Sequence, residues 1–282
     1  MTYMQIRDVS LHVKVMGQGY PLVLMHGGPG ADLYTLMSFK PCADQFTLVF
    51  SDHRCNGRSE GAEVSSMTME NLTADADALR QALGFEKWAV LGHSFGGHVA
   101  LEYALRYPQS LSHLLLVDTG GDSRWAQENA PKVLEQRGFP QEIVDLSRRF
   151  LNGQIEPKEM FPILMKLGNA YNPYTGLRQL PHLIIMGLQT KLQPEALIFG
   201  TSHFKGWTVM DRLGEIQAPT LVMAGREDFQ FPPEHQEELA AGIPHARLVI
   251  IDRAGHNPHD EQPAEVLKAV REFLADVNPG IA

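Results

Sequence analysis

The sequence has few cysteines and no long apolar run. It contains 2 cysteines in 282 residues, Cys42 and Cys55, and they do not form a CxxC motif. Such a pair provides no disulfide framework, so we expect two reduced thiols. No apolar stretch reaches the roughly 18 residues of a membrane-spanning helix, and the first residues lack the apolar segment of a secretory signal. We therefore expect a cytoplasmic protein that does not associate with a membrane.

Basic clusters and metal-binding motifs are also missing. The chain has 24 lysines and arginines against 33 aspartates and glutamates, which gives a net charge of −9. Because nucleic acids attract concentrated positive charge, an acidic chain without a basic tract predicts no nucleic-acid partner. There is no HExxH motif and no clustered spacing of histidine, cysteine and aspartate, so we expect neither a metal nor another cofactor. The sequence leaves the oligomeric state open.

The sequence does contain an alternation of apolar strands and amphipathic helices. A hairpin is expected over 3–7 and 10–16. The further strands predicted in the first half cover 21–25, 46–51, 87–92 and 113–118, with helices over 67–83 and 96–106. Parallel strands need crossover connections, and these helices supply them. The pattern predicts an α/β fold, with a mostly parallel, doubly wound sheet and helices on both faces.

The alternation stops over residues 122–206. This stretch predicts several helices, over 124–137, 141–151 and 157–167, which glycines and prolines separate. The alternation then resumes, with strands over 219–225 and 247–251 and helices over 233–241 and 264–277. We therefore predict a core domain of residues 1–121 and 207–282, with a helical cap, or lid, of residues 122–206 inserted into it.

Residues 92–97 read Gly-His-Ser-Phe-Gly-Gly, with Ser94 at the centre. They join a predicted strand to a predicted helix, and Gly-x-Ser-x-Gly at such a junction is the pattern of a nucleophile elbow. Small flanking residues let the strand and the helix approach each other while the serine is held in strained geometry. Glycine and serine are common and the pattern also occurs by chance. The catalytic interpretation therefore needs a base, an acid and an oxyanion hole elsewhere in the chain.

A candidate acid and a candidate base follow later strands. Asp228 comes after strand 219–225 and His256 after strand 247–251, and functional groups gather at the C-terminal ends of strands in doubly wound sheets. A histidine can take the proton of a serine hydroxyl, and an aspartate can orient that histidine. We therefore predict a catalytic triad of Ser94, Asp228 and His256. The alternatives are turn and structural roles for the acid and the base, and the competing residues are Glu227, His93 and His259.

His26-Gly-Gly-Pro-Gly30 follows the strand predicted over 21–25. Glycines allow a backbone to approach a substrate closely, and backbone N–H groups can stabilise the oxyanion that forms during acyl transfer. We predict one donor at Phe95, directly after the nucleophile, and the other at Gly28, with Gly27 as the second choice. Pro29 has no N–H to donate. The alternative is a plain Gly-Pro turn.

Together these motifs resemble the α/β-hydrolase superfamily over nearly the whole chain, and more narrowly the proline iminopeptidase group, peptidase family S33. The resemblance rests on His26-Gly-Gly-Pro-Gly30, Asp52-His-Arg-Cys-Asn-Gly-Arg-Ser59, Gly92-His-Ser-Phe-Gly-Gly97, Gly225-Arg-Glu-Asp228 and Gly255-His256. Two positions depart from the pattern: Cys55 stands where the family usually has glycine, and Phe95 where iminopeptidases tend to have tryptophan. The resemblance implies a serine hydrolase that forms an acyl-enzyme with a short-peptide or small-molecule substrate.

The resemblance also implies how the substrate is held. It implies an aminopeptidase that releases an N-terminal residue, with substrate contacts from His26, Gly27 and Pro29 and from cap carboxylates that bind the free α-amino group. The candidates are Glu128, Glu135, Glu142, Glu156, Glu159 and Glu195, of which Glu156 and Glu159 are retained as site residues. Each is alternatively a solvated charge on a helix face. Apolar cap residues are expected to pack the cap and to line an acyl or prolyl pocket.

Two other functions fit the same residues. A carboxylesterase, a lactonase or a small-amide hydrolase would use the same triad, and an apolar pocket in the cap also suits an ester. A ligand receptor on the hydrolase fold can keep the triad without turning over substrate. One fold carries many functions, so the substrate must come from the site itself.

Overall fold

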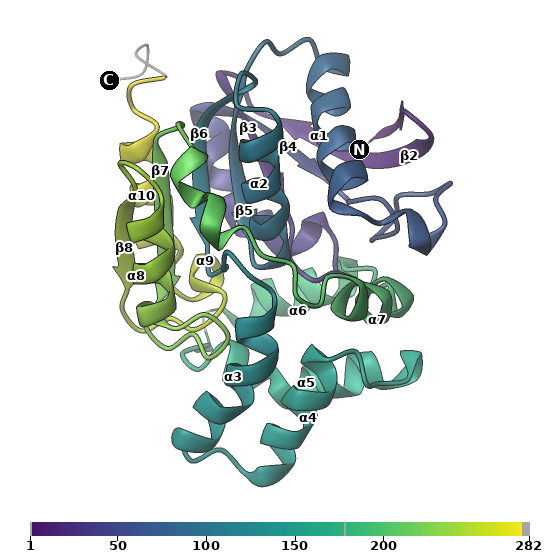
Figure 1. Ribbon diagram of the computed structural model, residues 1–282, viewed down its shortest axis with the longest axis vertical. Coiled ribbons are helices and arrows are strands. Elements are labelled where there is room, and N and C mark those ends of the chain that lie inside the picture. Colours follow the sequence, from purple (N-terminus) through teal and green to yellow (C-terminus); the bar gives the residue numbers. More distant parts are fainter. Residues whose placement is uncertain (1, 178, 278–282) are drawn as a thin grey trace.

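The computed structural model of the chain describes residues 2–177 and 179–277. One eight-stranded sheet lies at its centre, in the order β1-β2-β4-β3-β5-β6-β7-β8 (Figure 1). The strands are β1 (Thr2–Ile6), β2 (Val9–Met16), β3 (Tyr20–Met25), β4 (Phe46–Ser51), β5 (Trp88–His93), β6 (Leu111–Val117), β7 (Thr220–Gly225) and β8 (Arg247–Ile251).

The edge of the sheet is antiparallel and the rest is parallel. β1 pairs with β2 as a hairpin, and β2 pairs with β4 in the antiparallel direction. All other neighbouring strands run in parallel. The predicted mostly parallel sheet with an edge hairpin is therefore confirmed. All parallel strands point their C-terminal ends the same way, which brings the segments after β5, β7 and β8 to one edge of the sheet.

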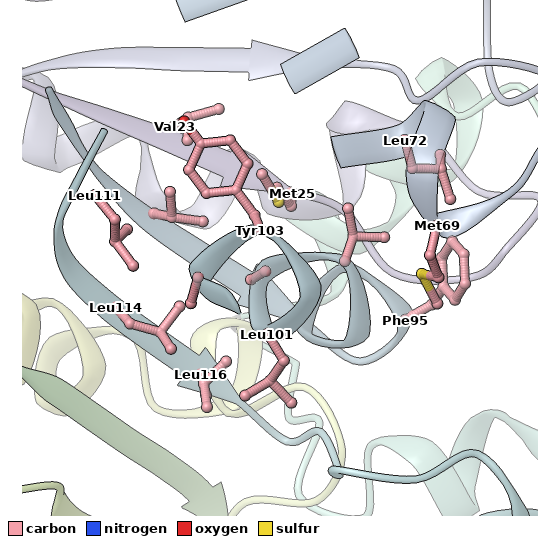
Figure 2. Packing of buried hydrophobic residues seen from close by; sticks show 14 of the residues in the cluster. Val23, Met25, Met69, Leu72, Phe95, Leu101, Tyr103, Leu111, Leu114 and Leu116 are labelled. Atoms are coloured by element: carbon pink, nitrogen blue, oxygen red, sulfur yellow. The ribbon is translucent and has the colours of Figure 1, made fainter. Parts of the chain in front are cut away.

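Helices cover both faces of the sheet. In β3, Val23 and Met25 face one apolar cluster, whereas Leu22 and Leu24 face another, because successive side chains of a strand point to opposite faces. Figure 2 shows Leu101 and Tyr103 of the helix after β5 in the first cluster, together with strand residues such as Val23. A sheet covered on both faces reads as continuous apolar strands, which is why these strands were visible in the sequence.

The helices around the sheet are close to those expected. The α-helices are α1 (Met69–Ala82), α2 (Phe95–Arg106), α8 (Pro233–Gly242), α9 (Pro258–Glu261) and α10 (Pro263–Phe273). The 3-10 helices are η1 (Leu33–Asp44), η2 (Val64–Ser66) and η4 (Met210–Glu215). α9 and these three 3-10 helices were not predicted. The sequence of α1 specifies its start, because the Thr68 hydroxyl accepts a hydrogen bond from the Asn71 N–H.

The segment between β6 and β7 forms helices and, among its described residues, no strand of the sheet. The helices are α3 (Arg124–Gln136), α4 (Gln141–Leu151), η3 (Pro157–Glu159), α5 (Met160–Tyr171), α6 (Leu180–Gln189) and α7 (Pro194–His203). They gather at one end of the molecule (Figure 1). An isolated bridge between Asp122 and Thr208 brings the two ends of the segment together. The division into a core and a cap of residues 122–206 stays a prediction.

None of the helices that the structure describes is long and apolar enough to span a membrane.

The cysteines Cys42 and Cys55 are both free thiols. Cys55 has a φ of 65°, in the left-handed region that favours glycine. This backbone conformation gives a physical reason why the proline iminopeptidase group, which the sequence resembles, usually has glycine at this position.

Candidate active site

Ser94 stands in a strained turn between β5 and α2. Its φ is 52° and its ψ is −123°, which a residue with a side chain adopts only when its surroundings enforce it. Glycines make the turn possible: a Cβ on Gly92 would lie 2.4 Å from the carbonyl oxygen of Gly96, and a Cβ on Gly96 would lie 2.0 Å from that of Met25. The turn therefore holds the Ser94 hydroxyl at the C-terminal edge of the sheet.

Ser94, His256 and Asp228 form a continuous hydrogen-bonded chain. His256 Nε2 lies 3.0 Å from Ser94 Oγ, and His256 Nδ1 lies 2.9 Å from Asp228 Oδ2. The three side chains come from the ends of β5, β8 and β7, and all are buried. These are the contacts needed for a histidine to take the serine proton while the carboxylate stabilises the imidazolium. The sequence placed all three residues at strand ends, and the fold brings them together.

The backbone of His256 is held from two sides. Its N–H donates to the carbonyl oxygen of Tyr171, at the end of α5, over 2.9 Å. Its carbonyl oxygen accepts from His93 Nε2, also over 2.9 Å. His259 donates through Nε2 to the carbonyl oxygen of Thr35. The competing histidines are therefore engaged elsewhere, and His93 supports the backbone of His256.

A second buried carboxyl group lies next to the acid. Asp118 follows β6 directly and is fully buried, and its Oδ1 accepts the Gly225 N–H over 2.8 Å. Burial and the charge of Asp228 raise the pKa of Asp118 well above its ordinary value. Burial opposes ionisation of Asp228 as well, but the interactions with His256 outweigh it and lower the pKa of Asp228. Sequence reasoning missed Asp118, although its place at the end of a strand was a usable signal.

The glycine-rich loop after β3 lies beside Ser94, and His26 supports it from behind. His26 is fully buried, donates through Nδ1 to the Gly27 carbonyl over 2.7 Å and accepts the His53 N–H at Nε2 over 3.0 Å. The Gly30 N–H donates to Asn56 Oδ1. Gly27, Gly28 and Pro29 line the cavity described below, and His26 is not among the described residues that do. His26 thus holds the loop through these contacts, and its predicted contact with the substrate stays a prediction.

Phe95 is the first residue of α2, where backbone N–H groups have no partner within the helix. The Gly97 N–H already bonds the Ser94 carbonyl. Gly28 has a φ of 113°, which only glycine adopts without strain. Gly28, Ser94 and Phe95 also line one common hollow. The arrangement is compatible with two backbone donors beside the serine, as an oxyanion hole requires.

A cavity of about 580 Å³ opens beside Ser94 and His256. Most of its wall comes from apolar side chains of the helices between β6 and β7, including Phe150, Met160, Leu164 and Leu197. Besides the histidines, its polar groups are uncharged side chains such as Tyr171, Asn172, Gln230 and Asn257. No described residue of the lining carries a carboxylate. Sites that bind small molecules are typically apolar in this way, with a few polar groups that fix orientation.

The structure does not bring the predicted cap carboxylates to this cavity. Glu156 forms an exposed ion pair with Lys158 over 2.8 Å, and Glu159 forms a half-buried ion pair with Arg149 over 2.8 Å. Neither is among the described residues of the lining, and the same holds for Glu128, Glu135, Glu142 and Glu195. Glu156 and Glu159 also cap η3. The described lining of the cavity therefore gives no support to their predicted role as substrate ligands, which stays a prediction.

Within residues 2–177 and 179–277, no group of three or more histidine, cysteine or acidic side chains is arranged to hold a metal ion.

Comparisons with known proteins agree with this fold. Residues 20–263 match the family model described as alpha/beta hydrolase fold. A proline iminopeptidase of Pestalotiopsis fici is 27% identical over 96% of this chain and 98% of its own. A proline iminopeptidase structure from Mycobacterium smegmatis has a TM-score of 0.80 at 22% identity, covering 100% of this chain and 99% of its own. A thermophilic esterase structure from Thermogutta terrifontis has a TM-score of 0.73 at 28% identity, and the match covers 99% of this chain and 100% of its own.

Proposed function

The chain belongs to the alpha/beta hydrolase fold family, and from this premise we propose that it is a serine hydrolase that cleaves carboxylic esters or lactones through an acyl-enzyme. The observation that carries the proposal is the hydrogen-bonded chain of Ser94, His256 and Asp228 beside a largely apolar cavity. In this proposal Ser94 is the nucleophile, His256 the general base and Asp228 the group that orients it. The reaction requires no cofactor.

Acylation begins when Ser94 Oγ attacks the ester carbonyl carbon and its proton passes to His256 Nε2. The carbonyl oxygen becomes an oxyanion, which the N–H groups of Gly28 and Phe95 stabilise, and one such donor contributes about 3–4 kcal/mol to the transition state. The tetrahedral intermediate then collapses. The bond to the leaving oxygen breaks, and that oxygen takes the proton from His256 Nε2 and departs as an alcohol.

Deacylation repeats the same steps with water. His256 Nε2 takes a proton from a water molecule, whose oxygen attacks the acyl carbon bound to Ser94 Oγ. The second tetrahedral intermediate collapses, and Ser94 Oγ recovers its proton from His256. The products are a carboxylic acid and the free enzyme, so protons and bonds balance over the cycle.

The wall of the cavity favours an uncharged substrate. A carboxylate is the strongest partner for a free α-amino group in an apolar pocket, because burying an unpaired ammonium group is very costly. The described residues of the cavity lining supply none. An ester or a lactone has no charge to satisfy and fits the apolar side chains that the cap provides.

An aminopeptidase that prefers N-terminal proline is the second candidate. It is favoured by the His26-Gly-Gly-Pro-Gly30 loop and by the similarity to the proline iminopeptidase of Pestalotiopsis fici. In this candidate the α-amino group would be held by uncharged oxygens, such as those of Asn172 and Gln230, which line the cavity. Cleavage of a prolyl arylamide, abolished by N-acetylation, is the behaviour that distinguishes it.

The two candidates are separated by one set of assays. The purified protein is offered 4-nitrophenyl butyrate and prolyl-4-nitroanilide side by side, and kcat/KM is measured for each. We expect the ester to be hydrolysed and the amide to be cleaved far more slowly. A preference for the amide that disappears on N-acetylation of the proline would favour the aminopeptidase instead.

The Ser94→Ala variant tests the mechanism behind either candidate. It should fold normally, lose labelling by a fluorophosphonate probe, and lose turnover by a factor on the order of 10⁴ or more. Ser202→Ala is the matched control, because Ser202 is an exposed serine of α7 whose hydroxyl donates to carbonyl oxygens of its own helix. Turnover retained by a folded Ser94→Ala variant would exclude Ser94 as the nucleophile.

A further inference from the structure

A second, smaller cavity meets the large cavity at Ser94. It measures about 70 Å³, and Gly28, Pro29 and Ser94 belong to the walls of both. Its own walls come from α2, the beginning of α3, α7 and the segment after β7. One buried water needs roughly 10–15 Å³ of such space. The small cavity therefore has room for a group of several non-hydrogen atoms beside the serine.

The position of His256 decides which part of a substrate enters which cavity. His256 lines the large cavity, but it is not among the described residues that line the small one. The leaving oxygen takes its proton from His256 Nε2, so the leaving group lies on the side of the large cavity. Gly28 and Phe95, the proposed oxyanion donors, both line the small cavity. Gly28 lines both cavities, whereas Phe95 is among the described residues of the small one alone. With the leaving group in the large cavity, the small cavity is the space beside Ser94 that remains for the substituent on the carbonyl carbon.

On this basis we propose that the small cavity is the acyl subsite for a short, uncharged acyl group that carries a hydroxyl, and that the large cavity holds an apolar alcohol portion. The inference rests on the serine esterase function proposed above, and it adds the substrate class. Short hydroxyacyl esters of medium-sized apolar alcohols are the substrates that fit both cavities.

Two buried polar side chains in the wall of the small cavity explain why we expect an acyl group with a hydroxyl to be preferred. Gln127, of α3, is 9% exposed, and its Nε2 donates to the Thr201 carbonyl over 2.8 Å. Within the described part of the chain, no donor reaches Gln127 Oε1. An acyl hydroxyl in the cavity would supply the hydrogen bond that this buried acceptor lacks.

His98, of α2, is the second polar group in the wall. It is 7% exposed, and neither ring nitrogen has a hydrogen-bond partner among the described residues. Burial, together with His235, lowers the pKa of His98 to about 3, so the ring is neutral at physiological pH. The described wall of the small cavity contains no lysine, arginine, aspartate or glutamate. It therefore selects against an acyl group with an ammonium or carboxylate substituent.

The orientation is tested with a pair of isomeric esters. Hexyl acetate and methyl heptanoate contain the same atoms, but the first has a short acyl group and the second a short alcohol. We expect kcat/KM to be higher for hexyl acetate by about tenfold or more, a typical discrimination for a pocket that must exclude extra methylenes. A preference for methyl heptanoate would overturn the assignment of the two cavities.

Wall variants make this test specific to each cavity. Ala126 is buried in the wall of the small cavity, so Ala126→Leu should reduce hydrolysis of hexyl butyrate more than that of hexyl acetate. Leu164 lines the large cavity and is not among the described residues of the small one. Leu164→Trp should therefore reduce hydrolysis of hexyl acetate more than that of methyl acetate. The opposite pattern of sensitivities would also overturn the assignment.

The hydroxyl preference is tested with hexyl glycolate and hexyl propionate, which differ by a hydroxyl in place of a methyl group. The ratio of their kcat/KM values is compared between the wild type and Gln127→Leu, so that intrinsic reactivity cancels. We expect the ratio to fall by about tenfold in the variant. An unchanged ratio would overturn the role of Gln127, and Gln127→Met provides the same measurement if Gln127→Leu does not fold.

Failure of this inference is distinguishable from failure of the proposed function. If no ester is hydrolysed and the fluorophosphonate does not label Ser94, the hydrolase function itself is overturned. If esters are hydrolysed and Ser94 is labelled, but the isomer preference is reversed, only the subsite assignment is overturned.

Discussion

Asp118 and Asp228 are two fully buried carboxyl groups that interact at the ends of the neighbouring strands β6 and β7. Two adjacent buried carboxylates repel each other, so one of them keeps its proton. Asp228 faces His256, which stabilises its charged form, and the proton therefore stays on Asp118. Asp118 Oδ2 has no donor within the described chain, so as a hydroxyl it is free to donate to Asp228. Asp118 is thus a positioning residue for the proposed catalytic acid.

The first prediction follows from this pair. Asp118→Asn keeps one oxygen for the Gly225 N–H and one N–H donor for Asp228, so kcat/KM should stay within about threefold of the wild type. Asp118→Leu removes both bonds, which costs about 1–3 kcal/mol, and kcat/KM should fall by about 10- to 100-fold. The measurement is ester hydrolysis by both variants across pH 6–9. An equal loss in both variants would mean that Asp118 acts as a charged group.

The second prediction concerns the oxyanion loop. A Cβ on Gly28 would lie 2.9 Å from the backbone nitrogens of Gly30 and Ala31, in addition to the strain of a φ of 113°. Gly28→Ala should therefore displace the loop and lower kcat by about 10²–10³-fold, the loss typical of one oxyanion donor.

Gly84→Ala is the matched control for the loop variant. Gly84 also has a positive φ, of 77°, but a Cβ there would meet nothing within 4 Å. Its cost should appear as a loss of about 1 kcal/mol in the free energy of unfolding, without an effect on kcat. A Gly28→Ala variant that resembles Gly84→Ala in both measurements would exclude Gly28 as an oxyanion donor.

Much of the fold was predictable because the sheet is covered on both faces. Buried parallel strands are continuous apolar runs, so the predicted strands 46–51 and 247–251 have the bounds that the structure gives to β4 and β8. The helices α6 and α7 were not predicted, and α6 was missed because Pro181 was taken as an interruption. Pro181 lies in the first turn of α6, where a helix does not need the missing N–H.

The site was predictable only where a residue has a fixed place in the chain. Ser94 is marked by its turn, and Asp228 and His256 by the strands before them. Asp118 also follows a strand, but its importance depends on its contact with Asp228, which lies 110 residues further along the chain. The role of His26 as a loop support depends on the backbone of His53. Contacts of this kind between distant segments leave no local pattern in the sequence.

The third prediction concerns the cap carboxylates that the family resemblance had suggested. Glu156 and Glu159 pair with Lys158 and Arg149 on the surface, away from the described lining of the cavity. Glu156→Gln and Glu159→Gln should therefore leave kcat/KM unchanged for esters and for prolyl-4-nitroanilide. A specific rise in KM for the amide in either variant would restore these residues as amine ligands.

The fourth prediction is a pH dependence of stability that comes from Glu261. This residue of α9 is 2% exposed, and its carboxylate accepts the N–H groups of Gly255 over 2.6 Å and Tyr174 over 2.5 Å. Burial raises the pKa of Glu261 to about 7 from an ordinary value of 4.5, despite these two bonds. The native state therefore keeps a proton between about pH 4.5 and 7 that the unfolded chain has released.

The sign of the effect follows from proton linkage. Where the native state binds more protons than the unfolded state, the free energy of unfolding falls as pH rises, by at most about 1.4 kcal/mol per pH unit for one group. The stabilising contribution of Glu261 is thus complete below about pH 4.5 and is lost as pH rises through 7. In Glu261→Gln this titration is absent, so the stability advantage of the wild type over the variant should shrink by about 2–3 kcal/mol from pH 4.5 to pH 8.

Urea denaturation of the wild type and Glu261→Gln at several pH values measures this difference. Glutamine has one acceptor oxygen where glutamate has two, so the variant also loses one of the two N–H contacts, but that loss is the same at every pH. The trend with pH, and not the offset, therefore reports the proton on Glu261. A difference in stability that stays constant, or that grows as pH rises, would show that Glu261 is already ionised at pH 5. The contacts to Gly255 and Tyr174 would then be charge-assisted throughout, and the segment before His256 would be held more firmly at neutral pH than we expect.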